Sequence, residues 1–284
     1  MRIRLDRAGA GLTARLADIA AGQVAPVAAR DAATVVVIRT ETAGAGIEVL
    51  MLRRTAAMKF APGAYVFPGG SVDPGDYREV GWQGPPAAEF GSTLGAPEEV
   101  ARALVCAAVR ETFEESGVLL AGPPGSGPPA TPSGPGWAAD QLAVAAGELT
   151  FAELLSRRGL VVRADLLVPW ARWITPEVEP RRFDARFFAA ALPDGQQPVG
   201  HAAEADHVAW LSPAAAIASA QAGEISLLPP TVTTLNDFAS ATAAGDGIAA
   251  ILSARRTIEP VLPRVIVEDG AAWLVLPDEV GYPR

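Results

Sequence analysis

The hydrophobic positions near the start of the chain fall in short runs separated by turn-forming residues. The apolar and β-branched runs Ala33 to Arg39 and Ile47 to Arg53 flank Glu41 to Gly46, a turn-rich stretch with two glycines. Runs bounded in this way are typical of β-strands. We therefore expect a strand pair here, and a further strand at Phe67 to Gly70 that enters a tight turn where glycine lets the backbone approach a ligand.

A helical pattern replaces the strand pattern between Pro97 and Gly117. Pro97, Glu98 and Glu99 stand where the first turn of a helix favours proline and acidic residues. Gly117 can take the left-handed conformation that ends many helices. At 100° per residue, the apolar residues up to Phe113 gather on one side, which we expect to face the core.

Two Gly- and Pro-rich stretches interrupt the pattern elsewhere. Residues 73–97 are too punctuated to predict a regular element and are a candidate lid or pocket wall, and residues 122–137 predict a mobile loop. Further helices are expected at Leu12 to Ala21, Ala138 to Glu148, Phe151 to Arg158, Ala214 to Gln221 and Val232 to Ala243. Further strands are expected at Arg181 to Ala189 and His207 to Leu211, with a hairpin at Arg264 to Val267 and Ala272 to Leu276.

Three acids on the long predicted helix are the leading candidates for chemistry. Glu111, Glu114 and Glu115 stand at positions i, i+3 and i+4, so their carboxylates share one stripe. The C-terminal end of a helix already carries about half a negative charge, which makes acids unfavourable there. Arg110 can offset one acid. The others are either a solvated acidic face or ligands of a hard divalent cation, Mg²⁺ or Mn²⁺.

Two sequence motifs carry a resemblance to a known family. They are Phe67-Pro68-Gly69-Gly70 and Arg110-Glu111-Thr112-Phe113-Glu114-Glu115-Ser116-Gly117-Val118. Together they resemble the Nudix hydrolases, whose signature is G-x5-E-x7-R-E-U-x-E-E-x-G-U with U apolar. Asp76 takes the first Glu slot, and it lies 34 positions before Arg110 where the signature has eight, so 26 residues are inserted. Thr112 takes the first apolar slot.

The resemblance implies a fold and a domain organisation. We expect an α/β fold, a Nudix-type α/β/α sandwich with a mixed β-sheet, over residues 31–230. Residues 73–97 would be its insertion. Residues 1–30 would form an N-terminal extension, and residues 231–284 a C-terminal helical and hairpin extension packed on the same domain.

The resemblance also implies roles for the residues of the second motif. Glu114 and Glu115 would be the principal metal ligands, and Glu111 a third ligand or the general base. Arg110 would orient the carboxylates rather than touch substrate.

Four arginines are candidates for binding phosphate. Arg53 and Arg54 end a predicted strand, where they either clamp phosphate or form a solvated strand end. Arg182 and Arg186 share a strand face with Asp184, so they either hold phosphate or pair with acids.

The remaining candidates are two glycines and three acids. Gly69 and Gly70 are expected at the substrate. Glu204 and Asp206 precede a predicted strand at a place where Nudix enzymes often carry a further acid on a loop, and the alternative is an ordinary surface loop. Asp76 is the other possible additional acid.

Composition narrows the partners and the compartment. The chain has 284 residues, half of them hydrophobic, with a net charge of −9, which argues against nucleic acid and acidic membranes as partners. The one cysteine, Cys106, allows no internal disulfide and is expected as a small buried hydrophobe. No apolar run reaches the ~18 residues that span a bilayer, and the last residues lack a Ser-Lys-Leu address. We expect a cytoplasmic protein; a homodimer is one candidate assembly.

The predicted function follows from the resemblance. It is metal-dependent cleavage of the diphosphate in a nucleoside diphosphate linked to another moiety. The subgroup with an insertion in its box includes peroxisomal coenzyme A diphosphatases, which points to coenzyme A or acyl-CoA. The alternatives are hydrolysis of ADP-ribose or a dinucleotide and, more distantly, a non-catalytic ligand sensor.

Overall fold

A computed structural model describes residues 2–4, 10–41, 46–57, 61–125, 127, 129–200, 205–243, 245, 247–269 and 271–277. The helices are α1 Ala10–Ala20, α2 Ala87–Leu94, α3 Glu98–Ser116, α4 Pro135–Ala145, α5 Phe151–Arg158, α6 Pro213–Gln221, α7 Pro229–Thr242 and α8 Gly247–Leu252, with 3-10 turns η1 Pro74–Tyr77 and η2 Ala164–Leu166. The strands are β1 Arg2–Arg4, β2 Arg30–Thr40, β3 Ile47–Arg54, β4 Ala64–Val66, β5 Gly69–Ser71, β6 Trp82–Gln83, β7 Ala121–Gly122, β8 Val161–Arg163, β9 Val168–Ile174, β10 Phe183–Ala191, β11 Ala205–Leu211, β12 Ser226–Leu227, β13 Pro260–Val261, β14 Arg264–Glu268 and β15 Ala271–Val275.

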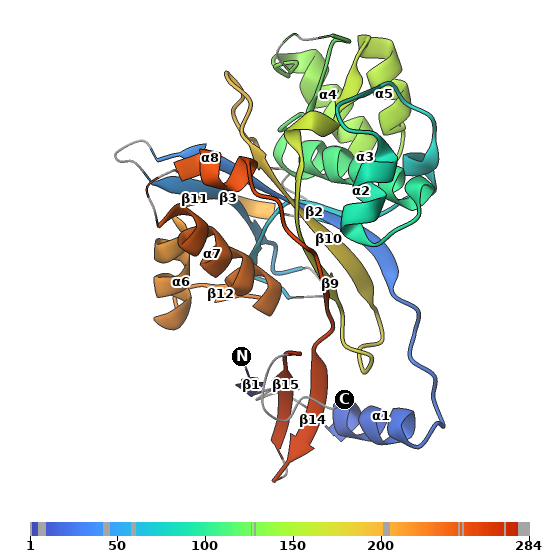
Figure 1. Ribbon diagram of the computed structural model, residues 1–284, viewed down its shortest axis with the longest axis vertical. Helices are drawn as coiled ribbons and strands as arrows, with labels where there is room; N and C mark the ends of the chain where they lie inside the picture. The colour runs from blue at the N-terminus through green and yellow to red at the C-terminus, as the bar shows by residue number, and fades with distance from the viewer. Residues whose placement is uncertain are drawn as a thin grey trace. The chain divides into compact units, whose positions relative to one another are not determined.

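Within the described residues, the main sheet contains nine strands. Seven follow the order β12-β4-β3-β2-β10-β9-β13, while β11 pairs with β3 and β5 pairs with β2. The predicted strand pair is confirmed as β2 and β3, which are antiparallel with Ile38 opposite Val49. The parallel pairing of β12 with β4 makes the sheet mixed. Figure 1 shows α2 and α3 on one side of these strands and α6 and α7 on the other, which confirms the expected α/β/α sandwich.

The separation of β2 from β3 creates the place where the candidate site lies. The two strands pair directly only over Ile38 to Thr40 of β2. Beyond that point β4 pairs with β3, with Val66 opposite Leu52, while β11 follows the other edge of β3. Strand β5 pairs with β2, with Gly69 opposite Thr34. As a result β5 lies beside α3.

Helix α3 is the central helix that the sequence predicts. Gly117 ends it in the left-handed conformation, with φ of 70°, and its N–H donates to the Phe113 carbonyl at 2.8 Å. The apolar side of α3 is buried in the core with residues such as Val35 and Leu50. Cys106 lies on this buried side as expected, and burial raises the pKa of its thiol to about 12, which keeps it unreactive.

The expectation that residues 73–97 contain no regular element is wrong. They hold η1, β6 and the eight-residue helix α2, whose ends are marked by Pro86 and Gly95. Strand β6 pairs with β8, and Phe90 of α2 is only 3% exposed. Gly91 fits inside α2 because a Cβ there would lie 2.7 Å from the Ala96 carbonyl oxygen. The glycines and prolines therefore delimit structure, and the insertion packs against α3.

The predicted loop at 122–137 ends earlier than expected, because α4 begins at Pro135. No helix or strand occupies the described part of 123–134. The buried Gln196 side chain fastens this loop, since its amide donates to the carbonyls of Ala130 and Leu119 and accepts from the Leu119 N–H. The expected mobility of the loop stays a prediction.

Internal contacts divide the chain into two compact units. The larger contains Ala32–Ala171 and Arg186–Ile258, and the smaller Met1–Asp31, Arg172–Ala185 and Glu259–Arg284. The smaller unit contains α1 and the predicted terminal hairpin, confirmed as β14 and β15, with β1 added to β15. The domain boundaries expected from the sequence stay predictions. Within the described ranges, no helix combines the length and the apolar character needed to cross a membrane.

Candidate active site

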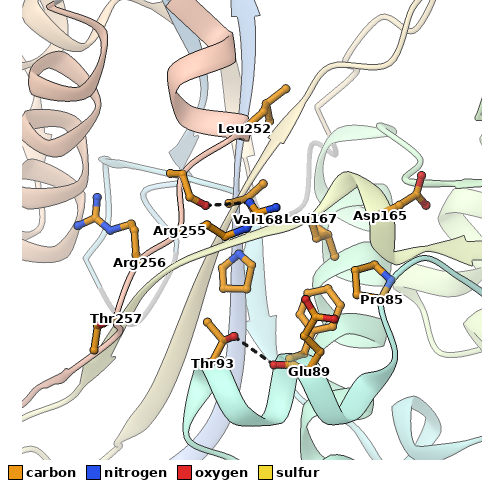
Figure 2. A pocket seen from close by; sticks show the side chains of 13 residues that line it. Pro85, Glu89, Thr93, Asp165, Leu167, Val168, Leu252, Arg255, Arg256 and Thr257 are labelled. Carbon is orange, nitrogen blue, oxygen red and sulfur yellow. Dashed lines mark hydrogen bonds between the residues drawn. The ribbon is translucent and has the colours of Figure 1, made fainter.

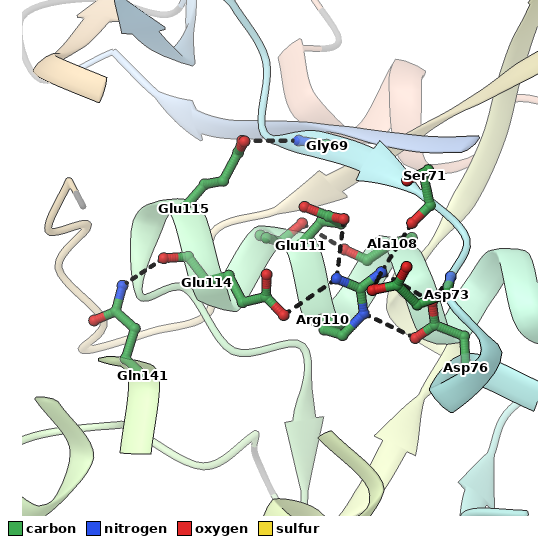
Figure 3. A network of polar contacts seen from close by, with 11 residues as sticks. Gly69, Ser71, Asp73, Asp76, Ala108, Arg110, Glu111, Glu114, Glu115 and Gln141 are labelled. Atoms are coloured by element: carbon green, nitrogen blue, oxygen red, sulfur yellow. Dashed lines mark hydrogen bonds and ion pairs between the residues drawn. The ribbon is translucent and has the colours of Figure 1, made fainter. Parts of the chain in front are cut away.

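The last two turns of α3 bring two of the three predicted acids onto one arginine. Arg110 donates through Nη1 to Glu111 Oε1 at 2.9 Å and to Glu114 Oε1 at 3.1 Å. Figure 3 shows these side chains on the face of α3 that meets β5 and η1. Only 13% of the Glu111 side chain and 15% of the Glu114 side chain are exposed. The acids predicted to share one stripe therefore lie mostly buried, where α3 contacts β5 and η1.

Asp76 completes the cluster from 34 residues upstream. Its carboxylate accepts from Arg110 Nε and Nη2, both at 2.9 Å, and from the Asp73 N–H at 2.8 Å. Arg110 Nη2 also donates to the Ser71 carbonyl at 3.0 Å. Each of the five N–H groups of the guanidinium thus has an acceptor. Although 26 residues are inserted, Asp76 reaches Arg110 because η1 turns directly after β5.

Glu115 lies on the other side of the stripe, against β5. Its Oε2 accepts the N–H of Gly69 at 2.9 Å. Gly70 borders Glu111, because a Cβ at Gly70 would lie 2.4 Å from Glu111 Oε1. Both glycines predicted at the site therefore contact its carboxylates, and at Gly70 the absent side chain makes room for one of them.

Electrostatics show that this cluster is short of positive charge. Burial raises the pKa of Glu111 to about 7, against the opposing effect of Arg110. Burial also raises the pKa of Glu114. Burial lowers the pKa of Arg110, but its hydrogen bond to Asp76 and the charges of the neighbouring acids raise it overall. Arg110 forms ion pairs with four carboxylates, those of Asp73, Asp76, Glu111 and Glu114.

The donor set suits a divalent cation in its chemistry, although the side chains do not converge on one point. Hard cations such as Mg²⁺ and Mn²⁺ prefer carboxylate oxygens, and a cation would supply the positive charge that the buried acids lack. In the part of the chain that the structure describes, no three His, Cys, Asp or Glu side chains form a group that could hold a metal. The acids instead bond to Arg110 and to the Gly69 N–H, so ligation requires some of them to turn.

Arg53, one of the two candidate phosphate ligands at the end of β3, forms an ion pair. Arg53 Nε donates to Asp206 Oδ1 at 2.6 Å, and this exposed ion pair raises the pKa of Arg53. The register between β11 and β3 shifts between Ala205 and His207, at the position of Asp206. Arg54 ends β3 opposite Ala205. Asp206 thus lies within β11 and not before the strand as expected. Glu204, the other acid predicted here, lies outside the described residues, so its role stays a prediction.

The other two arginines lie in different units. Arg182 belongs to the smaller unit, where its guanidinium donates to the backbone carbonyls of Val27 and Thr175. Asp184 accepts from Arg172 at 3.0 and 2.7 Å. Arg186 belongs to the larger unit and is only 3% exposed. Phosphate binding by Arg182 and by Arg186 stays a prediction.

Gln141 is a site neighbour that the sequence did not reveal. Its Nε2 donates to the main-chain carbonyl of Glu114 at 3.0 Å, as Figure 3 shows. The residue lies 27 positions away on α4, and no motif links the two.

A separate cavity of about 360 Å³ lies elsewhere in the larger unit, between α2, the start of β9 and the segment after α8 (Figure 2). The predicted site residues that the structure describes do not line it. Two of its charged groups are held in ion pairs, Asp165 with Arg163 and Arg256 with Asp237. Its mixed lining matches no single class of ligand.

Comparisons with known proteins agree with this geometry. The family model described as the NUDT19 Nudix domain matches residues 84–237. The human acyl-coenzyme A diphosphatase NUDT19 is 34% identical over 236 residues, covering 69% of this chain and 62% of the human protein. The chicken protein of the same name is 30% identical over 223 residues, covering 64% of this chain and 58% of its own length. The chain thus spans about three-fifths of the length of these relatives.

A solved structure gives the same result for the fold. The crystal structure of a NUDIX hydrolase from Alicyclobacillus acidocaldarius is 32% identical, with a TM-score of 0.63, and the match covers 81% of this chain and 98% of that one. The architecture is therefore a Nudix-type α/β/α sandwich. With the family model matching more than half of its length, the chain belongs to the Nudix family. The predicted resemblance to coenzyme A diphosphatases within that family is confirmed.

Proposed function

We propose that this protein is a metal-dependent hydrolase that cleaves the diphosphate of a nucleoside diphosphate linked to another moiety, with coenzyme A or acyl-CoA as substrate. Family membership supports the reaction class, and the names of the human and chicken relatives support the substrate class. The observation that carries the proposal is the cluster of Glu111 and Glu114 on Arg110, with Glu115 beside them.

The chemistry of the reaction explains why such a cluster is useful. A diphosphate resists attack because its oxygens are negative, so catalysis consists mainly of neutralising charge and positioning water. A bound Mg²⁺ or Mn²⁺ supplies that positive charge and lowers the pKa of bound water. Glu114 and Glu115 are the principal ligands in this proposal, and Arg110 keeps Glu111 and Glu114 in place through its bonds to them.

Glu111 is either a third ligand or the residue that accepts a proton from the attacking water. Its pKa of about 7, raised by burial, suits a general base that works near neutral pH. Gly70 leaves its carboxylate room to approach β5. Binding of substrate phosphates by Arg53, Arg54 and Arg186 is a further part of the proposal.

The test is a substrate panel assayed with Mg²⁺ and with Mn²⁺. Coenzyme A, an acyl-CoA, ADP-ribose and a reduced dinucleotide are compared by kcat/KM, and products are identified by mass. We expect the highest value for coenzyme A or acyl-CoA, with 3′,5′-ADP and the matching phosphopantetheine as products. A higher kcat/KM for ADP-ribose or the dinucleotide would assign that compound as the substrate. If none of the compounds were hydrolysed, the proposed enzymatic activity would be refuted. Sedimentation of the same preparation shows whether it is a homodimer.

A further inference from the structure

The last turn of α3 accepts hydrogen bonds from residues outside the Nudix signature. After Gly117 ends the helix, the carbonyls of its final residues have no partner within the helix. The Glu114 carbonyl accepts from the Gln141 side chain at 3.0 Å, and the Ser116 carbonyl accepts from the Val199 N–H at 2.8 Å. The turn that carries two predicted metal ligands is therefore fastened from outside.

The packing of α4 explains why Gln141 points at this turn. Trp137 stands four residues before Gln141, so both side chains lie on one face of α4. The Trp137 ring contacts the Phe113 ring edge-on, with centroids 6.1 Å apart, and Gln141 meets the next residue, Glu114. The Arg158 guanidinium stacks on the Trp137 ring, with its Cζ 4.2 Å from the ring centroid, and donates to the buried Asp140. The packing of α4 therefore holds Gln141 beside the last turn of α3.

Gln141 is a neutral residue that caps a negatively charged helix end. The C-terminal pole of α3 is already negative, and Glu111 and Glu114 add buried carboxylates there. A neutral amide satisfies the carbonyl without a charge that would compete with a bound cation, as a lysine at the same place would.

We propose that Gln141 is a positioning residue for the metal site: its amide fixes the main chain of Glu114 so that the Glu114 and Glu115 carboxylates can bind a divalent cation. This inference rests on the proposed function and extends it to a residue outside the signature. Gln141 does not touch the reacting atoms, and it acts through Glu114.

Two substitutions test whether Gln141 acts through its hydrogen bond to Glu114 or only through the volume of its side chain. Gln141→Leu keeps the approximate volume and removes the donor, and Gln141→Glu keeps the shape but places a carboxylate against the Glu114 carbonyl. A net hydrogen bond is worth about 1 kcal/mol, or roughly fivefold in an equilibrium. We expect Gln141→Leu to weaken Mn²⁺ binding and to lower kcat, each by about five- to tenfold, with KM for substrate unchanged. Gln141→Glu is expected to lower kcat at least as much.

The measurements are Mn²⁺ titration by electron paramagnetic resonance, steady-state kinetics and thermal unfolding of each variant. Gln221→Leu, at the exposed end of α6, is the matched control. Unchanged Mn²⁺ affinity and kcat in both variants would overturn the inference, and so would a lower unfolding temperature without those changes. If the wild-type protein bound no Mn²⁺, that result would instead refute the proposed function on which the inference rests.

Discussion

Each end of α3 carries glutamates, but the two pairs differ in exposure and in the charge of the helix pole beside them. Glu98 and Glu99 lie exposed in the first turn, where the positive pole of the helix favours them. Glu111 and Glu114 lie mostly buried near the negative pole, beside one arginine. The first pair can stabilise the helix without any partner. Burial disfavours the charged forms of the second pair. We therefore propose that the first pair serves stability and the second pair serves function.

The largest expected effect comes from neutralising the C-terminal acids. Glu114→Gln and Glu115→Gln keep the shape of the side chain and remove its charge, so each should lower turnover by at least ~10²-fold. For Glu114→Gln, the thermal unfolding temperature should stay at the wild-type value or above it, because burial already disfavours the charged form of Glu114. Initial rates at saturating substrate test this, with Glu99→Gln as control. Full turnover in both variants would contradict the assignment.

The next largest effect should come from Arg110→Lys. Lysine keeps the charge but offers three N–H donors in place of five, so the buried Asp76 loses part of its bidentate contact. We expect about 2–4 kcal/mol less stability in urea unfolding, together with reduced turnover. In a double-mutant cycle with Asp76→Asn, the losses should be less than additive by about 1–3 kcal/mol. Strictly additive losses would show that the two residues act independently.

Without metal, the comparison predicts a pH effect at Glu111. Burial raises its pKa from 4.5 to about 7, so between these values the folded state holds a proton that the unfolded state has lost. The free energy of unfolding should therefore fall as pH rises through this window, by on the order of 3 kcal/mol relative to Glu111→Gln. Urea unfolding with a chelator measures the difference. Excess Mg²⁺ should reduce it, because the cation favours the ionised carboxylate; parallel pH curves for the two proteins would contradict the prediction.

The smallest effect is expected at the other end of the helix. Glu98→Gln and Glu99→Gln remove a favourable interaction with the positive pole, worth about 0.3–1 kcal/mol and screened by salt. Turnover and Mn²⁺ affinity should not change. If either substitution lowered turnover tenfold, the distinction between the two ends of α3 would be lost.

The local part of this site could be predicted from the sequence. The spacing of Glu111, Glu114 and Glu115 and the terminating Gly117 depend only on helix geometry, and all of them lie as expected on α3. The strand pair and α5 were predictable for the same reason, because each depends on residues close together in the chain.

Contacts between distant segments were harder to predict. Asp76 meets Arg110 only because η1 follows β5, and Asp206 meets Arg53 where the register of β11 shifts. Helix α2 was missed because the glycines and prolines of residues 73–97 suggested a loop, whereas Pro86 and Gly95 mark the two ends of the helix. Gln141 offered no signal, since its contact with Glu114 depends on the packing of α4 against α3.

The most direct test of the central claim is a crystal structure of the protein grown with saturating Mn²⁺, with anomalous data recorded at the manganese edge. The account predicts an anomalous peak bonded to carboxylate oxygens of Glu114 and Glu115, with Glu115 turned from the Gly69 N–H that it contacts without metal. It would be contradicted by a map with no peak beside α3 in which Glu115 still accepts from Gly69 and Glu114 still accepts from Arg110.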